Sequence, residues 1–230
     1  PLYVKPTRKV GVREMQNMMR DHFEGTSLDM TKDIGAGAFK LPYRWRPLTY
    51  KVDGETYTHE RAIATQQTGF SLVAQLRNDK PDFMKTILWF GVDDANTCVY
   101  VPFYNCTTKV PHEFAVGNGD LYTLSWDAAF WVTNYVANQT YQRYSLMIDD
   151  VRKVQKELED SIAIDVNLVE REIAEFDAET ACKLSQEVSN IWSRKYVKRY
   201  KQLGDYLLVK YLDGNVKKEK DGKFERTPEG

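Results

Sequence analysis

The residue types that could perform catalysis are present in this chain, but they are scattered. The cysteines are Cys98, Cys106 and Cys182. They lack CxxC spacing, which argues against both a disulfide framework and a zinc site. Three buried free thiols are expected, with a single Cys98–Cys106 bridge as the alternative. The histidines, at positions 22, 59 and 112, are far apart in the sequence, and no HExxH motif occurs. We therefore expect no metal site.

Other short motifs are equally indecisive. Asp93 and Asp94 follow an apolar run and could form an acid–base pair, although such a pair more often ends a strand and caps the next turn. The glycine turns at 35–37 and 117–119 do not lie between a strand and a helix, as a phosphate-binding loop requires. The sequence contains no GxSxG elbow, Walker loop or GxGxxG motif. No self-sufficient catalytic motif is therefore present.

The composition is that of a folded chain without a strong charge bias. Of its 230 residues, 42% are hydrophobic and 28% are charged, with a formal net charge of -1. These values predict a buried core and give no reason to expect nucleic acid or an anionic membrane as a partner. No apolar run approaches the roughly 20 residues needed to cross a bilayer. The first residue is Pro1, and no signal-peptide pattern follows it, so we expect the chain to continue a longer polypeptide.

Residues 1–124 have short β-prone runs between proline and glycine, and we expect this part to be rich in strands. Asp53-Gly54 predicts a hairpin turn, and Pro102 favours an edge strand. The continuous apolar run at 87–92 predicts a central strand buried on both faces, and its Trp89–Val92 segment is expected to be deeply buried. The predicted elements are a helix at 12–23 and strands at 48–52, 56–59, 61–67, 71–76, 87–92 and 99–104.

Residues 125–203 are predicted to form a long helical hairpin, because 125–200 contain no proline or glycine and their apolar residues recur every three or four positions. Ser125 is the expected N-cap. Residues 149–179 are strongly acidic and 183–201 strongly basic, which favours antiparallel packing over a partner surface. A final strand is expected within 204–213, followed by a loose polar tail at 214–230.

Four segments together resemble a known family. The run Arg20-Asp21-His22-Phe23-Glu24-Gly25-Thr26-Ser27-Leu28-Asp29 resembles the RDHYEGTxxD segment of the bacterial dipeptidase A family of N-terminal-nucleophile cysteine hydrolases. Residues 65–77 are similar to that family's RTxxSxxxQxR strand, and residues 89–93 and 100–104 are similar to its WxGxDxxxxSxYVPFY stretch. The aromatic start of the helical half at 124–126 also fits, so the resemblance runs from residue 20 to about 150.

The resemblance implies a fold and a mechanism. Members of the family hydrolyse dipeptides with the thiolate of an N-terminal cysteine, whose own α-amino group acts as the base, without a metal or organic cofactor. Their fold is a four-layer αββα sandwich. Since none of the three cysteines here is near an N-terminus, we expect an α+β chain that forms the C-terminal half of such a sandwich, extended by the helical hairpin. By itself this chain should be inactive.

Candidate site residues can be named by their position and residue type. Arg61 could hold a substrate carboxylate, and Thr68 and Ser71 flank the best-matched strand. His22 and Glu24 lie beside Gly25, where they could line a cleft. Each could instead have a structural role.

The expected partners are a dipeptide substrate, the missing N-terminal segment and a second copy of the chain. Two alternatives to dipeptide hydrolysis remain. One is hydrolysis of other amides, such as acylated amino acids or bile-salt conjugates, and the other is a non-enzymatic helical module that mediates oligomerisation. The resemblance places the parent protein in the bacterial cytoplasm or, if it carries a signal peptide, in the periplasm or outside the cell.

Overall fold

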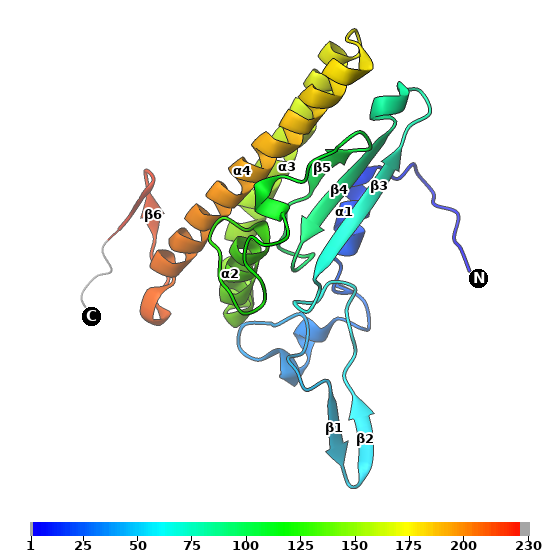
Figure 1. Ribbon diagram of the computed structural model, residues 1–230. Coiled ribbons are helices and arrows are strands. Elements are labelled where there is room, and N and C mark those ends of the chain that lie inside the picture. Colours follow the sequence, from blue (N-terminus) through cyan, green and yellow to red (C-terminus); the bar gives the residue numbers. More distant parts are fainter. Residues whose placement is uncertain (1, 226–230) are drawn as a thin grey trace.

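The computed structural model describes residues 2–225 and has the mixed α+β composition that the sequence predicts (Figure 1). Strands dominate the first half, and three helices dominate the second half. The helices are α1 (Val12–Met19), α2 (Ala129–Gln142), α3 (Tyr144–Ile173) and α4 (Ala178–Lys210). The strands are β1 (Thr49–Val52), β2 (Glu55–Thr58), β3 (Phe70–Leu76), β4 (Thr86–Val92), β5 (Val101–Tyr104), β6 (Glu219–Lys220) and β7 (Lys223–Phe224).

The main sheet is antiparallel with the order β3-β4-β5. Trp89 in β4 lies opposite Val73 on one side and Pro102 on the other. The central position of β4 and the edge position of Pro102 are therefore confirmed. An edge strand has a neighbouring strand on one side only, so a proline that lacks its N–H there removes no hydrogen bond between strands on the other side.

Burial of both faces of β4 was a wrong prediction for this chain. Ile87, Trp89 and Gly91 are buried, whereas Leu88, Phe90 and Val92 are only half-buried. Successive side chains of a strand point to opposite faces, so one whole face of β4 lacks a complete cover.

The helices cover the buried face of the sheet. Arg77, just after β3, donates to Glu170 of α3 at 2.5 and 2.7 Å, and Ser189 of α4 donates to the carbonyl of Pro102 in β5 at 2.7 Å. Trp89 contributes to the largest core cluster together with Val166 of α3 and Val188 of α4. This arrangement fixes the sheet, α3 and α4 as one packed unit.

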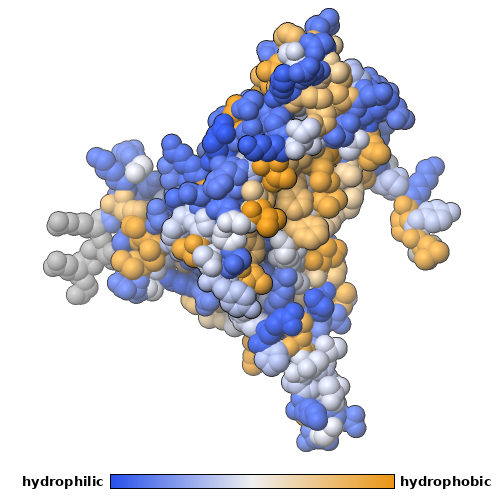
Figure 2. Space-filling view, viewed as in Figure 1, coloured by the Kyte–Doolittle hydropathy of each residue, from blue (hydrophilic) through white to orange (hydrophobic). Residues whose placement is uncertain are grey.

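The opposite face of the sheet is largely uncovered, and we call it the outer face. Phe70 and Leu76 in β3 are 60% and 76% exposed, and Leu72 between them is also exposed. Phe70 stacks on Phe90 at a centroid distance of 5.7 Å. Figure 2 shows hydrophobic side chains gathered over these strands. A contiguous apolar surface of this kind normally marks an interaction surface.

Helices α3 and α4 run antiparallel, as the charge asymmetry predicted (Figure 1). Basic residues of α4 pair with acidic residues of α3 along the hairpin. The pairs are Lys210–Asp150 at 2.7 Å, Arg199–Glu157 at 3.3 Å and Lys195–Asp165 at 4.0 Å. The predicted hairpin region also contains the separate helix α2, which begins at Ala129. Its N-cap is Ala128 and not Ser125, whose hydroxyl instead donates to Asn118.

The final strand predicted within 204–213 is wrong, because α4 continues to Lys210. Leu203, Leu207 and Tyr211 are buried at intervals of four, so the apolar run forms a helical stripe. Gly204 does not break the helix. A Cβ atom there would lie 2.2 Å from the Tyr135 ring of α2, so glycine permits close helix packing.

The tail predicted to be loose contains the small β6–β7 hairpin, and its residues 226–230 lie outside the described part. In the first half, the β1–β2 hairpin is confirmed. Asp53 and Gly54 have φ of 50° and 88°, as a turn with two left-handed residues requires. No helix among residues 2–225 is both long and apolar enough to cross a bilayer.

Two further predictions of secondary structure in the first half are wrong. The strand expected at 61–67 is irregular, because the N–H of Ala64 donates to the carbonyl of Asp21 at 3.0 Å and not to a neighbouring strand. The helix expected at 12–23 ends at Met19. Arg20 is its C-cap, and Phe23 adopts a φ of 62°, which continues no right-handed helix.

Candidate functional site

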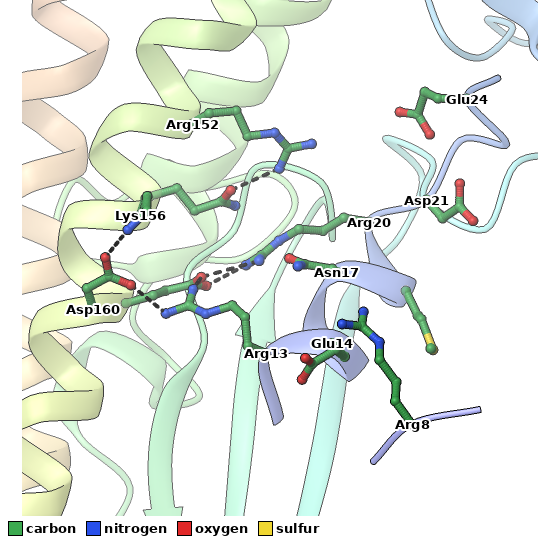
Figure 3. A pocket seen from close by; sticks show the side chains of 13 residues that line it. Arg8, Arg13, Glu14, Asn17, Arg20, Asp21, Glu24, Arg152, Lys156 and Asp160 are labelled. Atoms are coloured by element: carbon green, nitrogen blue, oxygen red, sulfur yellow. Dashed lines mark hydrogen bonds and ion pairs between the residues drawn. The ribbon is translucent and has the colours of Figure 1, made fainter. Parts of the chain in front are cut away.

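A charged cleft of about 850 Å³ lies between α1 and α3, and we call it the α1–α3 cleft (Figure 3). Residues from α1 and the loop after it form one wall, and residues of α3 form the other. The lining contains five basic and five acidic side chains: Arg8, Arg13, Arg20, Arg152, Lys156, Glu14, Asp21, Glu24, Glu159 and Asp160. A cleft with both signs of charge suits a ligand that carries both.

The floor of the α1–α3 cleft is a buried ion pair between Arg20 and Glu159. Arg20 is 6% exposed, and its guanidinium donates two hydrogen bonds to the Glu159 carboxylate and one to the carbonyl of Cys98 at 3.2 Å. Glu159 also accepts from Arg13 and from the backbone N–H of Tyr100. Burial by itself would lower the pKa of Arg20, but the Glu159 carboxylate raises it above its usual value. Arg20 therefore stays charged and fastens α1 to α3.

His22 and Glu24 form a compact turn at the end of the cleft. The Glu24 carboxylate accepts from the His22 backbone N–H at 2.9 Å, and it lies 3.3 Å from the His22 Nδ1. The hydrogen bond from the His22 side chain, with backbone hydrogen bonds, lowers the pKa of Glu24 to about 2. The His22 ring is fully buried, and its Nε2 has no hydrogen-bond partner among the described residues. Glu24 is thus a fixed anion, half-exposed to the cleft.

A second buried polar group begins where β4 ends. Asp94 accepts from the hydroxyls of Thr97 at 2.8 Å and Tyr141 at 3.1 Å, and burial raises its pKa. Asp93 has a φ of 66° and accepts from Asn134 at 3.1 Å, and burial raises its pKa to about 7. Asp94 therefore caps the turn after the strand, as the structural interpretation of this pair expected.

The family can be identified from comparison with known proteins. Residues 1–157, which are more than half of the chain, match the model described as peptidase family C69. This chain belongs to peptidase family C69. The match confirms the family that the four sequence segments indicated. No group of three or more His, Cys, Asp or Glu side chains within residues 2–225 is placed to hold a metal ion.

A similar curated protein is a probable dipeptidase of Latilactobacillus sakei. It is 29% identical over 104 residues, which make up 45% of this chain and 18% of that protein. The matched segment therefore spans about a fifth of the relative's length.

The cysteines of this C69 chain are all free, and a Cys98–Cys106 bridge is absent. Cys98 is fully buried, and its thiol donates to the carbonyl of Ala95. Burial raises its pKa to about 12, so it is protonated at neutral pH. A protonated, enclosed thiol is a poor nucleophile.

The structure brings together some of the site residues predicted from the sequence and leaves others apart. His22 and Glu24 contact each other. Ser71 is enclosed on the helix-covered face, where its hydroxyl lies 2.8 Å from that of Tyr100, which favours a structural role. Thr68 is half-buried in a turn just before β3. Arg61 is exposed and forms no hydrogen bond or ion pair through its side chain within residues 2–225.

Sequence reasoning missed the Arg20–Glu159 pair. Arg20 opens the best-matched family segment, but its partner is 139 positions away on a helix whose acidic residues look solvent-exposed. The available signal was positional. Glu159 follows Leu158 on the apolar stripe Met147, Val151, Val154, Leu158, Ile162, and so lies at the edge of the buried helix face.

Proposed function

We propose that this chain is the C-terminal part of a cysteine dipeptidase whose nucleophile lies on a segment outside this sequence. Membership of peptidase family C69 carries the proposal, and the Latilactobacillus sakei relative supports the choice of dipeptides. The nucleophile would be an N-terminal cysteine, with its own α-amino group as the base. An α-amino group suits that role because it titrates near neutral pH.

The cysteines of the chain support the assignment of the nucleophile to another segment. Cys98 is enclosed and protonated, and all three cysteines lie within the sequence, so none of them carries a free α-amino group of its own. Burial keeps the Cys98 thiol protonated at neutral pH although the Arg20 guanidinium lies nearby, and a protonated thiol attacks a peptide carbonyl slowly.

The outer face supports a sandwich in which a second sheet from the missing segment packs on β3, β4 and β5. Exposed Phe70, Leu72 and Leu76 would become buried there, and half-buried Phe90 would complete its packing. Two packed sheets lie about 10 Å apart with interdigitating side chains, which suits this row of apolar residues. An adjoining, mainly apolar hollow of about 430 Å³ extends from Gly69 and Phe70 to Trp131.

Within the proposed enzyme this chain would contribute groups that hold the substrate. Arg61 is a candidate for the dipeptide carboxylate, because its guanidinium is exposed and free of an acidic partner in the described residues. Thr68 lies beside the start of β3. Glu24, a fixed anion in the cleft, is a candidate for the dipeptide ammonium group, with His22 holding it in place.

The proposal is tested by assaying a panel of dipeptides with the full-length protein and with this chain alone. We expect turnover by the full-length protein and none by residues 1–230. Co-expression with the missing segment should restore activity. Turnover by the chain alone that is abolished by Cys98→Ser, Cys106→Ser or Cys182→Ser would overturn the proposal.

Hydrolysis of other amides remains the second candidate, since the same nucleophile and base would serve an acylated amino acid. The same panel, extended with acylated amino acids and bile-salt conjugates, distinguishes the two. Oligomerisation through the hairpin is a compatible role, because Ile164 and Leu168 of α3 are 59% and 51% exposed. Light scattering of the full-length protein measures it.

A further inference from the structure

The edge of β3 that faces away from β4 presents a row of backbone groups. At one end of the β3–β4 ladder, the N–H of Asp93 donates to the carbonyl of Gly69 at 2.8 Å. At the other end, the N–H of Arg77 donates to the carbonyl of Lys85 at 2.8 Å, and the register between these two bonds is regular. Because hydrogen-bonded and non-hydrogen-bonded pairs alternate along an antiparallel ladder, the odd-numbered residues direct their backbone groups toward β4. The residues whose backbone groups point away from β4 are therefore Phe70, Leu72, Ala74 and Leu76.

No group among residues 2–225 occupies this edge. Only β4 pairs with β3 in the described part of the chain, and no hydrogen bond there reaches the outward N–H and carbonyl groups of Leu72, Ala74 or Leu76. The strand has seven residues and contains no proline, charged residue or bulge, which are the usual features that keep an edge strand from pairing. A long, regular and uncharged edge is a template for a further strand.

The opposite edge of the same sheet is closed. The N–H of Asn105 donates to the carbonyl of Thr86 in β4, so Pro102 and Tyr104 of β5 direct their backbone groups away from β4. Pro102 has no N–H, and its carbonyl accepts from the hydroxyl of Ser189 in α4 at 2.7 Å. The carbonyl of Tyr104 accepts from the N–H three residues later at 2.9 Å. The sheet can therefore be extended beyond β3 and not beyond β5.

We propose that a strand of the missing segment pairs with the open edge of β3 and adds a fourth strand to this sheet. The inference rests on the proposed function, which places a further segment before this chain. The match to the Latilactobacillus sakei relative covers 18% of that protein, so most of the relative's chain lies outside the match. The described chain begins on the β3 side of the sheet, away from α4, and α1 packs against β3 (Figure 1). A preceding segment would thus enter on the side of the open edge.

The β3 edge also defines the pattern of the strand that fits it. Side chains of the added strand would alternate between the two faces of the sheet. On the outer face they would continue the exposed apolar row of Leu72 and Leu76, which the proposed second sheet covers. A strand of about five to seven residues with an apolar side chain at every second position meets this requirement.

Amide hydrogen exchange in the full-length protein, followed by NMR, tests the pairing. The outward amides of Leu72, Ala74 and Leu76 should exchange at rates within about 100-fold of those of the inward amides of Ser71 and Val73, because both sets are then hydrogen-bonded in one sheet. The inward amides are the control within the same strand. Outward amides that exchange faster than this would show an open edge and overturn the proposal.

Nuclear Overhauser effects between amides identify the partner strand. Effects that join Leu72 and Ala74 to residues upstream of this chain, and that persist on dilution, would support the proposal. Effects that join β3 to a second copy and disappear on dilution would overturn it. Effects to another segment of residues 1–230 would also overturn it.

Ala74→Pro and Ala74→Val are the matched variants. Both replace the same exposed side chain, but only proline removes an N–H that points to the open edge. In the full-length protein, Ala74→Pro should have a midpoint of thermal unfolding at least about 3 °C below that of Ala74→Val, and a smaller difference would overturn the proposal. Dipeptide turnover of the same samples separates this inference from the proposed function. Slow outward exchange without turnover would refute the dipeptidase alone, and turnover with fast outward exchange would refute the strand pairing alone.

Discussion

Replacement of Glu159 by alanine should destabilise the chain far more than replacement of the adjacent Asp160. Glu159 accepts hydrogen bonds from Arg20, Arg13 and the Tyr100 backbone, and it is almost completely buried. Its removal would leave the Arg20 guanidinium charged, 6% exposed and without a carboxylate partner. Arg20 cannot escape by losing its proton, because its pKa lies far above neutral.

The expected magnitude follows from this burial. Removal of one partner of a buried ion pair typically costs about 3–5 kcal/mol, because the remaining charge stays desolvated. Asp160 is the matched control on the same helix. It pairs with Lys156 and Arg13, and its own side chain is 43% exposed, so Asp160→Ala should cost about 0–1 kcal/mol.

The assay is urea unfolding of the full-length protein, followed by tryptophan fluorescence. A double replacement, Arg20→Met with Glu159→Leu, should cost less than Glu159→Ala, because no unpaired buried charge remains. If the free energies of unfolding of Glu159→Ala and Asp160→Ala lie within about 1 kcal/mol of each other, the assignment of the Arg20–Glu159 ion pair as the contact that holds α1 is refuted.

Three further predictions concern Asp93, Trp89 and Arg61. Burial raises the pKa of Asp93 from 3.8 to about 7, so between these pH values the folded state binds more protons and loses stability as pH rises. The free energy of unfolding of Asp93→Asn, relative to that of the wild type, should therefore increase by up to about 4 kcal/mol between pH 4 and pH 8. If the difference between the two proteins does not change with pH, Asp93 ionises freely in the folded state. Trp89→Ala should cost about 3–5 kcal/mol in urea unfolding, because Trp89 is buried on β4 and donates to Gln75; a cost below 1 kcal/mol would place it outside the core. In the proposed full-length dipeptidase, Arg61→Lys should raise KM for dipeptides much more than it lowers kcat, since the paired hydrogen bonds proposed between Arg61 and the substrate carboxylate would be lost; unchanged kinetics with lower thermal stability would make Arg61 structural.

Local sequence signals predicted the elements that local physics controls. The Asp53-Gly54 pair predicted the β1–β2 hairpin, because few residues other than glycine and aspartate or asparagine accept two left-handed positions in a row. The acidic character of α3 and the basic character of α4 predicted that the two helices pack on each other, and ion pairs such as Arg199–Glu157 and Lys210–Asp150 join them.

The failures come from tertiary contacts that the sequence does not display. The run Tyr206–Leu212 has the composition of a strand, but Leu207 and Tyr211 pack toward the core as part of a helix. Residues 61–67 look like a strand, but Ala64 bonds to the loop after α1. In both places the partner decides the conformation, and local propensity is too weak to oppose it.

The candidate site was only partly predictable for the same reason. His22 and Glu24 lie two positions apart, so their contact could be foreseen from the chain itself. Glu159 and Arg20 are far apart in sequence, and no motif connects them. The half-exposed face of β4 is a different case, since its apolar run is typical of a strand covered on both sides and the proposed second sheet would supply that cover.

The most direct measurement of the central claim is dipeptide turnover by the full-length protein carrying two alternative sets of substitutions. In the first, the cysteine that we propose as the N-terminal nucleophile of the full-length protein is replaced by serine. In the second, Cys98, Cys106 and Cys182 are all replaced by serine. The account predicts that the first protein loses turnover by several orders of magnitude, while the second retains wild-type kcat. Full activity in the first protein, or loss in the second without loss of folding, would contradict it.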